Sequence, residues 1–269
     1  MIVVGPTGTG VPVDEIIGEW NEGTGSSADT LEGRGRDARA GALAGRAIAR
    51  AVALATTGAV RGIVTAPIDK AALFAGGYDF PGHTEMLASL TGCPTVMMLA
   101  SPRLRVVLAT THIALRDVHA TLTRELIEQT ARITREALQR SFGIAEPRVA
   151  LCALNPHAGD QGRFGREDDE LLAPAARAAG IAGPFPADTV FVRAMRGEFD
   201  CVIAPYHDIG MTAIKVASFG DAVNVTLGLP FVRTSPDHGT ALGIAGSGTA
   251  SEQSLVAAVL SAVRILSHP

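Results

Sequence analysis

Residues 201–215 read CVIAPYHDIGMTAIK, and this stretch indicates both the fold class and the place of the chemistry. The apolar run 201–204 has the length and composition of a buried strand, and Pro205 ends it. His207 and Asp208 follow at once, so the strand presents polar side chains from its carboxyl end. Open parallel sheets bind ligands at that end of their strands. The alternative is an ordinary polar turn, which this stretch alone does not exclude.

The composition of the whole chain is typical of a globular α/β protein. Of its 269 residues, 47% are hydrophobic and only 4% aromatic, so the core must consist mainly of Ala, Val, Leu and Ile. This length allows one large or two small domains. The net charge is −4 and no run of five like charges occurs, which predicts neither a nucleic-acid nor a membrane-surface partner.

Three features predict a cytoplasmic location. The opening MIVVGPTGTG has no basic region ahead of its apolar run, unlike a signal peptide. The most apolar long segment, 38–60, contains Arg46 and Arg50, which argues against a membrane span. The three cysteines are far apart in the sequence, which predicts free thiols in a reducing compartment.

Apolar runs of strand length alternate along the chain with segments of helical periodicity. This alternation predicts an α/β fold with a largely parallel sheet. Strands are expected at 62–65, 95–100, 104–109, 149–154 and 201–204, and helices at 37–57, 123–140, 167–179 and 254–266.

Two further predicted strands end in the same way as 201–204. His112 lies just beyond 104–109, and His157 lies just beyond 149–154. Because parallel strands present their carboxyl ends at one edge of a sheet, these two imidazoles and His207 can come together. Three neutral imidazoles with an open coordination position are a typical catalytic site for Zn²⁺ or a similar divalent ion. An isolated His is more often a hydrogen-bonded loop residue, so this prediction depends on the predicted fold.

Other polar residues fit a small anionic substrate. Lys215 follows His207 by eight residues, and Asn224 and Arg233 flank the apolar segment VTLGLPFV. Arg suits bidentate contact with a carboxylate or phosphate, although either cation taken alone could be a surface charge. Residues 81–88, PGHTEMLA, predict a loop that opens a helix, where free N–H groups favour an anion beside His83 and Thr84.

At these residues the sequence resembles the 4-hydroxythreonine-4-phosphate dehydrogenases of pyridoxal phosphate biosynthesis and their close relatives. The similarity extends from about Gly62 to the C-terminus, and its motifs together are highly specific. They are VTAPIDK (64–70), PGHTEMLA (81–88), TTHIALRDV (110–118), NPHAGDQGRFG (155–165), PADTVF (186–191), YHDIGMTAIK (206–215) and VNVTLGLPFVRTSPDHGTA (223–241).

The resemblance implies a fold like that of isocitrate and isopropylmalate dehydrogenases, with two α/β domains and a cleft between them. The first domain would comprise residues 1–80 and 226–269 and hold the cofactor loop. The second, 81–225, would hold the metal and substrate site and the dimer contact. The resemblance also implies a homodimer with a shared active site, in which the metal ligands are drawn from both subunits.

The resemblance assigns roles to individual residues. The metal would be held by His112, His157 and His207. Substrate contacts would come from His83, Thr84, Lys215, Asn224 and Arg233, with Asp188 beside the metal. Lys215 or Asp188 would transfer the proton, and the sequence does not separate them. The stretch SPDHGTALGIAGSG (235–248) is similar to the loop that holds the adenosine half of NAD or NADP, which assigns Asp237, His238, Gly239 and Thr240 to the cofactor.

The sequence departs from the family pattern at three places. The opening strand and GDPAGIGPE loop of the family are absent, so we expect either a misplaced start or a shortened member. Gly243 and Ser247 replace the Asp and Lys of the usual DIAGKG loop, which bears on cofactor type. YHDIGMTAIK differs from the commoner YHDQGLxPLK beside the metal, where substrate choice is decided.

The leading hypothesis is therefore a metal-dependent, NAD(P)-linked oxidation of a secondary alcohol, followed by decarboxylation of the β-keto acid. The substrate would be 4-phosphooxy-threonine or a related 4-phosphorylated sugar acid, or alternatively a cis-dihydrodiol of an aromatic carboxylate. The metal would be Zn²⁺, or Mg²⁺, Mn²⁺ or Co²⁺. Two alternatives belong to other classes: a metal-dependent lyase or hydrolase without the nucleotide, and a non-catalytic binding paralogue.

Overall fold

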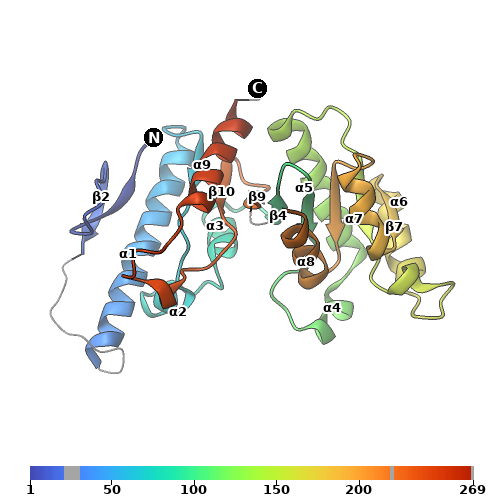
Figure 1. The fold of residues 1–269 in the computed structure, drawn as a ribbon, viewed down its shortest axis with the longest axis horizontal. Helices are drawn as coiled ribbons and strands as arrows, with labels where there is room; N and C mark the ends of the chain where they lie inside the picture. The colour runs from blue at the N-terminus through green and yellow to red at the C-terminus, as the bar shows by residue number, and fades with distance from the viewer. Residues whose placement is uncertain (21–30, 219–220, 268–269) are drawn as a thin grey trace. The chain divides into compact units, whose positions relative to one another are not determined.

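The structure, a computed structural model, describes residues 1–20, 31–218 and 221–267, and of residues 31–37 only the backbone. Helices and strands occur together in the chain, which confirms the predicted α/β class (Figure 1). The chain divides into two compact units, and the domain boundaries predicted from the sequence remain a prediction. The first unit is Met1–Cys93, Leu229–Phe231 and His238–Ala250, and the second is Pro94–Gly228, Val232–Asp237 and Ser251–Pro269.

The first unit is organised around α1 (Leu31–Thr56). This helix approaches α2 (Lys70–Ala75) very closely, because a Cβ on Gly41 would lie only 1.6 Å from the carbonyl oxygen of Ala72. The core of the first unit is formed by Ile48, Val52, Ala55, Ile63, Met86, Leu87 and Phe231. Its other elements are β1 (Val4–Thr7), which pairs in parallel with β2 (Glu15–Glu19), and β3 (Gly62–Val64), α3 (His83–Thr91) and the 3₁₀ turn Leu242–Ile244.

The second unit contains a mixed sheet whose strands lie in the order β10-β9-β4-β5-β8-β6-β7. Neighbours from β10 to β5 pair antiparallel, whereas those from β5 to β7 pair in parallel. The prediction of a largely parallel sheet was therefore wrong for one half, because local apolar patterns do not report strand direction. The bounds are β4 (Val96–Ala100), β5 (Arg105–Leu108), β6 (Val149–Cys152), β7 (Ala182–Phe185), β8 (Cys201–Ala204), β9 (Val223–Leu227) and β10 (Val232–Pro236).

The helices of the second unit begin and end at recognisable signals. In the longest of them, α5, the hydroxyl oxygen of Thr123 accepts a hydrogen bond from the backbone N–H of Leu126, and Gly143 ends the helix in the left-handed conformation. This agrees with the amphipathic helix predicted there. The bounds are α4 (Leu115–Thr121), α5 (Arg124–Phe142), α6 (Ala173–Ala179), α7 (Ala187–Met195), α8 (His207–Ser218) and α9 (Gln253–Leu266), with a π-helical turn at Asp168–Leu172.

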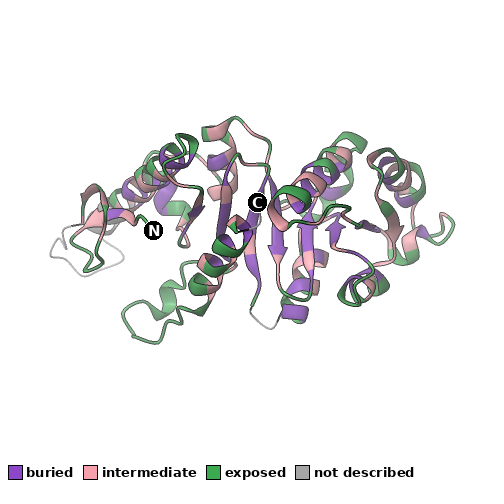
Figure 2. Cartoon of the chain, turned by 90° about the horizontal axis from the view of Figure 1, so that it is seen from above, coloured by how far each residue is buried: buried purple, intermediate pink, exposed green. Residues whose placement is uncertain are grey.

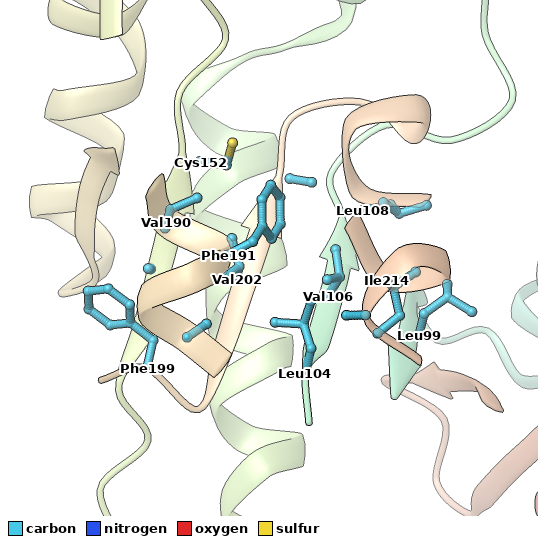
Figure 3. Close-up of a cluster of buried hydrophobic side chains, with 14 of the residues drawn as sticks. Leu99, Leu104, Val106, Leu108, Cys152, Val190, Phe191, Phe199, Val202 and Ile214 are labelled. Atoms are coloured by element: carbon cyan, nitrogen blue, oxygen red, sulfur yellow. The ribbon is translucent and has the colours of Figure 1, made fainter. Parts of the chain in front are cut away.

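One face of this sheet is covered by α7 and α8 (Figure 3). Alternate strand residues point to that face, including Val106 and Leu108 of β5 and Val202 and Ala204 of β8. α5 lies against β4 and β9, and it also contacts α6 and α9. β6 and β8 are consequently buried along their whole length and β5 from Val106 onward, while the outer faces of the helices are exposed (Figure 2). Burial on both faces explains why these strands are continuously apolar in the sequence.

The cysteines agree with the sequence prediction of free thiols. Cys93, Cys152 and Cys201 are free thiols, and burial raises the pKa of Cys152 and of Cys201 to about 12. Within the described ranges, no helix is long and apolar enough to cross a membrane.

Candidate active site

Three neighbouring parallel strands end at the same edge of the sheet of the second unit. β8 lies between β5 and β6, and it pairs in parallel with both. His112, His207 and His157 follow β5, β8 and β6 respectively. The common strand-end context predicted for the three imidazoles is therefore present in the tertiary structure.

His112 and His207 lie side by side. Their ring centroids are 5.4 Å apart and the ring planes are inclined by 46°. Two imidazoles that bind one tetrahedral ion through Zn–N bonds of about 2.0–2.1 Å have centroids about 5 Å apart, so this spacing fits a shared ion. Nδ1 of His207 lies 2.7 Å from Oδ1 of Asp208, which leaves Nε2 for a metal. A carboxylate on the second ring nitrogen is the usual support of a metal-binding His.

Backbone and side-chain hydrogen bonds hold these two loops together. The N–H of Ala109 donates to the carbonyl oxygen of Ala204 at 2.9 Å, which extends the pairing of the two strands. The buried hydroxyl of Thr110 donates to the carbonyl oxygen of Pro205 at 2.8 Å. The sequence motif contained Thr110, but its partner is far away in the chain, so its role was not predicted.

His157 lies in a separate loop. It belongs to a short 3₁₀ turn with left-handed backbone, and its ring is 6.5 Å from that of Phe164, centroid to centroid. Among the residues that the structure describes, no three His, Cys, Asp or Glu side chains form a ready metal cluster. The set of His112, His157 and His207 as ligands of one ion remains a prediction.

Lys215 forms an ion pair that joins two of the predicted roles. It lies in the last turn of α8, and its Nζ is 2.5 Å from Oδ2 of Asp237, at the end of β10. The Asp237 side chain is only 5% exposed, whereas that of Lys215 is 43% exposed. Asp237, which the sequence assigned to the cofactor, thus contacts the predicted proton-transfer residue.

Arg233 and Asn224 lie on the paired strands β10 and β9. Arg233 is 2% exposed, its Nη1 donates to the hydroxyl of Thr226 at 2.9 Å, and burial lowers the pKa of its guanidinium to about 10. Oδ1 of Asn224 is buried and has no hydrogen-bond partner among the described residues. A buried acceptor of this kind costs stability unless a ligand or water satisfies it.

The remaining predicted site residues lie on other elements. Asp188 is exposed in the first turn of α7. His83 and Thr84 are half-buried at the start of α3 in the first unit, where no side chain caps the helix. His238, Gly239 and Thr240 are exposed in the same unit, and Nδ1 of His238 lies 2.9 Å from the carbonyl oxygen of Gly239.

The protein-family model described as "Pyridoxal phosphate biosynthetic protein PdxA" matches residues 27–262. A 4-hydroxythreonine-4-phosphate dehydrogenase of Caulobacter vibrioides is 49% identical over 221 residues, which cover 78% of this chain and 66% of the relative. A D-threonate 4-phosphate dehydrogenase of Cupriavidus necator is 52% identical over 204 residues, covering 73% of this chain and 61% of the relative. This chain thus spans less than two thirds of the length of either relative.

A solved structure of 4-hydroxythreonine-4-phosphate dehydrogenase from Klebsiella pneumoniae superimposes with a TM-score of 0.79. It is 45% identical in sequence, and the match covers 85% of this chain and 71% of that one. The family match over most of the chain and this likeness in sequence and fold lead to one conclusion. The chain belongs to the family of pyridoxal phosphate biosynthetic protein PdxA.

Proposed function

We propose that this chain carries the active site of a metal-dependent, NAD(P)-linked dehydrogenase that oxidises a secondary alcohol in a small 4-phosphorylated acid. The observation that carries the proposal is the close pair of His112 and His207, 5.4 Å apart between centroids at neighbouring parallel strand ends. Relatives that are 49% and 52% identical to this chain are named for 4-hydroxythreonine-4-phosphate and for D-threonate 4-phosphate. Both compounds are 4-phosphorylated acids that carry a secondary hydroxyl group.

The metal would be held by His112 and His207, with His157 as the third ligand. Imidazole nitrogen favours Zn²⁺ or Co²⁺ over Mg²⁺, and the carboxylate of Asp208 would keep the ring of His207 oriented. When bound, a divalent ion would supply Lewis acidity at a substrate hydroxyl, and NAD or NADP would supply the hydride acceptor. The remaining steps depend on side chains of this chain.

Arg233 would bind an anionic group of the substrate, because its guanidinium is buried and so loses little free energy to competing water. Asn224 would contribute the buried acceptor Oδ1 to a substrate hydroxyl or ammonium group. His83 and Thr84, in the first turn of α3, would hold a further anionic group, which the N-terminal end of a helix favours.

Lys215 is the better candidate for proton transfer. Its Nζ donates a hydrogen bond to Asp237. Lys215 could therefore pass one proton to the Asp237 carboxylate as it takes a proton from the substrate hydroxyl. Asp188 is exposed and would act beside the metal instead. The exposed loop that begins at His238 would hold the adenosine half of NAD or NADP, where Leu242 and Ile244, 65% and 43% exposed, offer apolar surface to the adenine ring.

The test is a substrate panel with the purified protein. Formation of reduced nicotinamide is followed with NAD or NADP and 4-hydroxythreonine-4-phosphate, D-threonate 4-phosphate or a cis-dihydrodiol of an aromatic carboxylate. We expect turnover of a phosphorylated acid that chelation abolishes and Zn²⁺ or Co²⁺ restores. His207→Ala should lose metal binding and turnover, whereas the control Val216→Ala, at an exposed position of the same helix, should keep both.

Two outcomes would count against the proposal. Turnover that persists in metal-free protein would exclude the metal-dependent mechanism. Binding of metal and phosphorylated acid without any binding of NAD or NADP at millimolar concentration would favour the lyase or hydrolase alternative. Light scattering tests the remaining proposal that the protein is a homodimer whose subunits share the site, and a monomer at full activity would contradict it.

A further inference from the structure

A buried carboxylate lies beneath the loop that carries His157. Asp168 is fully buried, and both of its oxygens accept hydrogen bonds from the beginning of this loop. Oδ1 accepts from the backbone N–H of Leu154 at 2.7 Å. Oδ2 accepts from the backbone N–H and from the side-chain amide of Asn155, both at 3.0 Å. Asp168 therefore holds the backbone at the end of β6, two residues before His157.

The loop itself has an unfavourable backbone. His157, Ala158, Asp160 and Gln161 all have positive φ angles, between 46° and 59°, and the intervening Gly159 has a φ of 85°. The left-handed region is unfavourable for residues that carry a Cβ, so a run of this kind persists only where its surroundings hold it.

The C-terminal end of the loop, at Gly165, is held by the cluster of Asn155, Glu167 and Asp168. The amide of Asn155 donates to Oε2 of Glu167 at 2.8 Å as well as to Asp168. Gly165 lies against this cluster so tightly that a Cβ there would be 2.3 Å from Oε2 of Glu167. The π-helical turn that begins at Asp168 follows directly, and such turns are frequent beside functional sites.

We propose that Asp168 is a positioning residue that sets the direction of the His157 imidazole toward the metal site. It acts through Asn155, whose backbone N–H and side-chain amide both donate to it. This inference rests on the proposed function, in which His157 is a ligand. It also reaches beyond it, because Asp168 is buried and acts on the loop backbone, and none of the proposed ligand or substrate contacts uses it. Partners that hydrogen-bond directly to a metal ligand change metal affinity about 10–100-fold when they are mutated, and Asp168, which acts through the loop backbone, is expected at the lower end of that range.

Asp168→Asn is the direct test. The amide keeps the size of the carboxyl group but replaces one acceptor oxygen with a donor, so at least one of the three N–H groups loses its partner. Asp169→Asn is the matched control, because it makes the same chemical change at the neighbouring exposed position. Asn155→Ala is a milder second variant that leaves both backbone hydrogen bonds of Asp168 in place.

Two measurements are made on each variant. Titration with Co²⁺ gives the metal affinity, and the absorption spectrum of bound Co²⁺ reports the ligand set, with His157→Ala as the reference for a missing imidazole. Trypsin cleavage after the exposed Arg163 reports the order of the loop without any metal. Circular dichroism establishes that each variant is folded.

We expect Asp168→Asn to bind Co²⁺ about 10-fold more weakly, with a spectrum like that of His157→Ala, and to be cleaved faster at Arg163. Asn155→Ala should show the same changes at smaller size, and Asp169→Asn none. A folded Asp168→Asn with wild-type affinity, spectrum and cleavage rate overturns the inference. Wild-type protein that binds no Co²⁺ overturns the proposed function, and with it the role of His157.

Discussion

Replacement of Gly210 by Ala tests how the two proposed catalytic residues of α8 are placed. Gly210 is buried on the side of the helix that faces the sheet. A Cβ there would lie 2.4 Å from Cδ2 of Leu108 and 3.0 Å from both Cβ of Ala204 and Cγ1 of Val106. The Leu tip can rotate a little, but an Ala Cβ cannot move, and a β-branched Val side chain is stiff. The helix itself must therefore shift away from the strands.

The net cost follows from two opposing terms. Overpacking a well-packed core costs about 1–3 kcal/mol, and three short contacts at once place this site at the upper end. Ala in place of Gly inside a helix returns about 1 kcal/mol. The net loss of about 2 kcal/mol corresponds to a fall of about 4–8 °C in the melting temperature. Because His207 and Lys215 lie on the same helix, a misplacement of about 1 Å would also lower kcat/KM by up to about 10²-fold.

The assay is thermal unfolding by calorimetry, together with urea unfolding at neutral pH. The control is Thr212→Ala, at an exposed position of the same helix, where the better helix former should leave the melting temperature unchanged or slightly higher. The reasoning is refuted if Gly210→Ala melts at or above the wild-type temperature. In that case α8 would not be held against the strands in the way these contacts require.

Three further predictions concern charged residues. Burial would raise the pKa of Asp200, but hydrogen bonds from Arg148 outweigh this and hold the pKa below its ordinary value. The stability that this pair contributes is therefore complete above about pH 4, and it is lost as the pH falls through the lowered pKa. Asp200→Asn should therefore be less stable at neutral pH and approach the wild type in acid, and a constant difference across urea unfolding curves at several pH values would contradict this. Asp237→Asn should lower kcat. It should change the free energy of unfolding by less than about 1 kcal/mol, because Lys215 is partly exposed to solvent. A higher KM for NAD or NADP at an unchanged kcat would instead favour a role of Asp237 in cofactor binding. Arg233→Met should raise the substrate KM about 10–100-fold, because a hydrogen bond to a charged group contributes about 1.5–3 kcal/mol. Its melting temperature should be unchanged or higher. A variant with a lower melting temperature and an unchanged KM would contradict this prediction.

Much of the site was predictable from local sequence. The apolar runs before His112, His157 and His207 are strands in the structure, and each of these residues follows its strand within a few positions. Such runs are readable because strands buried on both faces carry continuous apolar sequence. The helix that opens at His83 and the long amphipathic α5 were predictable for the same kind of reason, since helical periodicity is a local signal, and α5 also has the capping residue Thr123.

The partners of these residues were not predictable. Asp237 lies far from Lys215 in the sequence, and Asp168 lies beyond the loop whose first residues it binds. An acidic residue in a polar stretch reads in the sequence as a solvated side chain, and only burial reveals that it holds backbone N–H groups. The direction of β9 and β10 also escaped prediction, because antiparallel and parallel strands share the same alternation of side chains.

The sequence by itself determined which segments form strands and helices, which polar residues stand at strand ends, and to which family the motifs belong. These properties follow from the order of residues over short stretches, where side-chain pattern and backbone preference act directly. Only the tertiary structure decided that β8 lies between β5 and β6, so that His207 comes next to His112. It also decided that Lys215 pairs with Asp237 and that Asp168 supports the His157 loop. Those contacts arise from strand order and burial, which depend on the packing of segments that are distant in the chain.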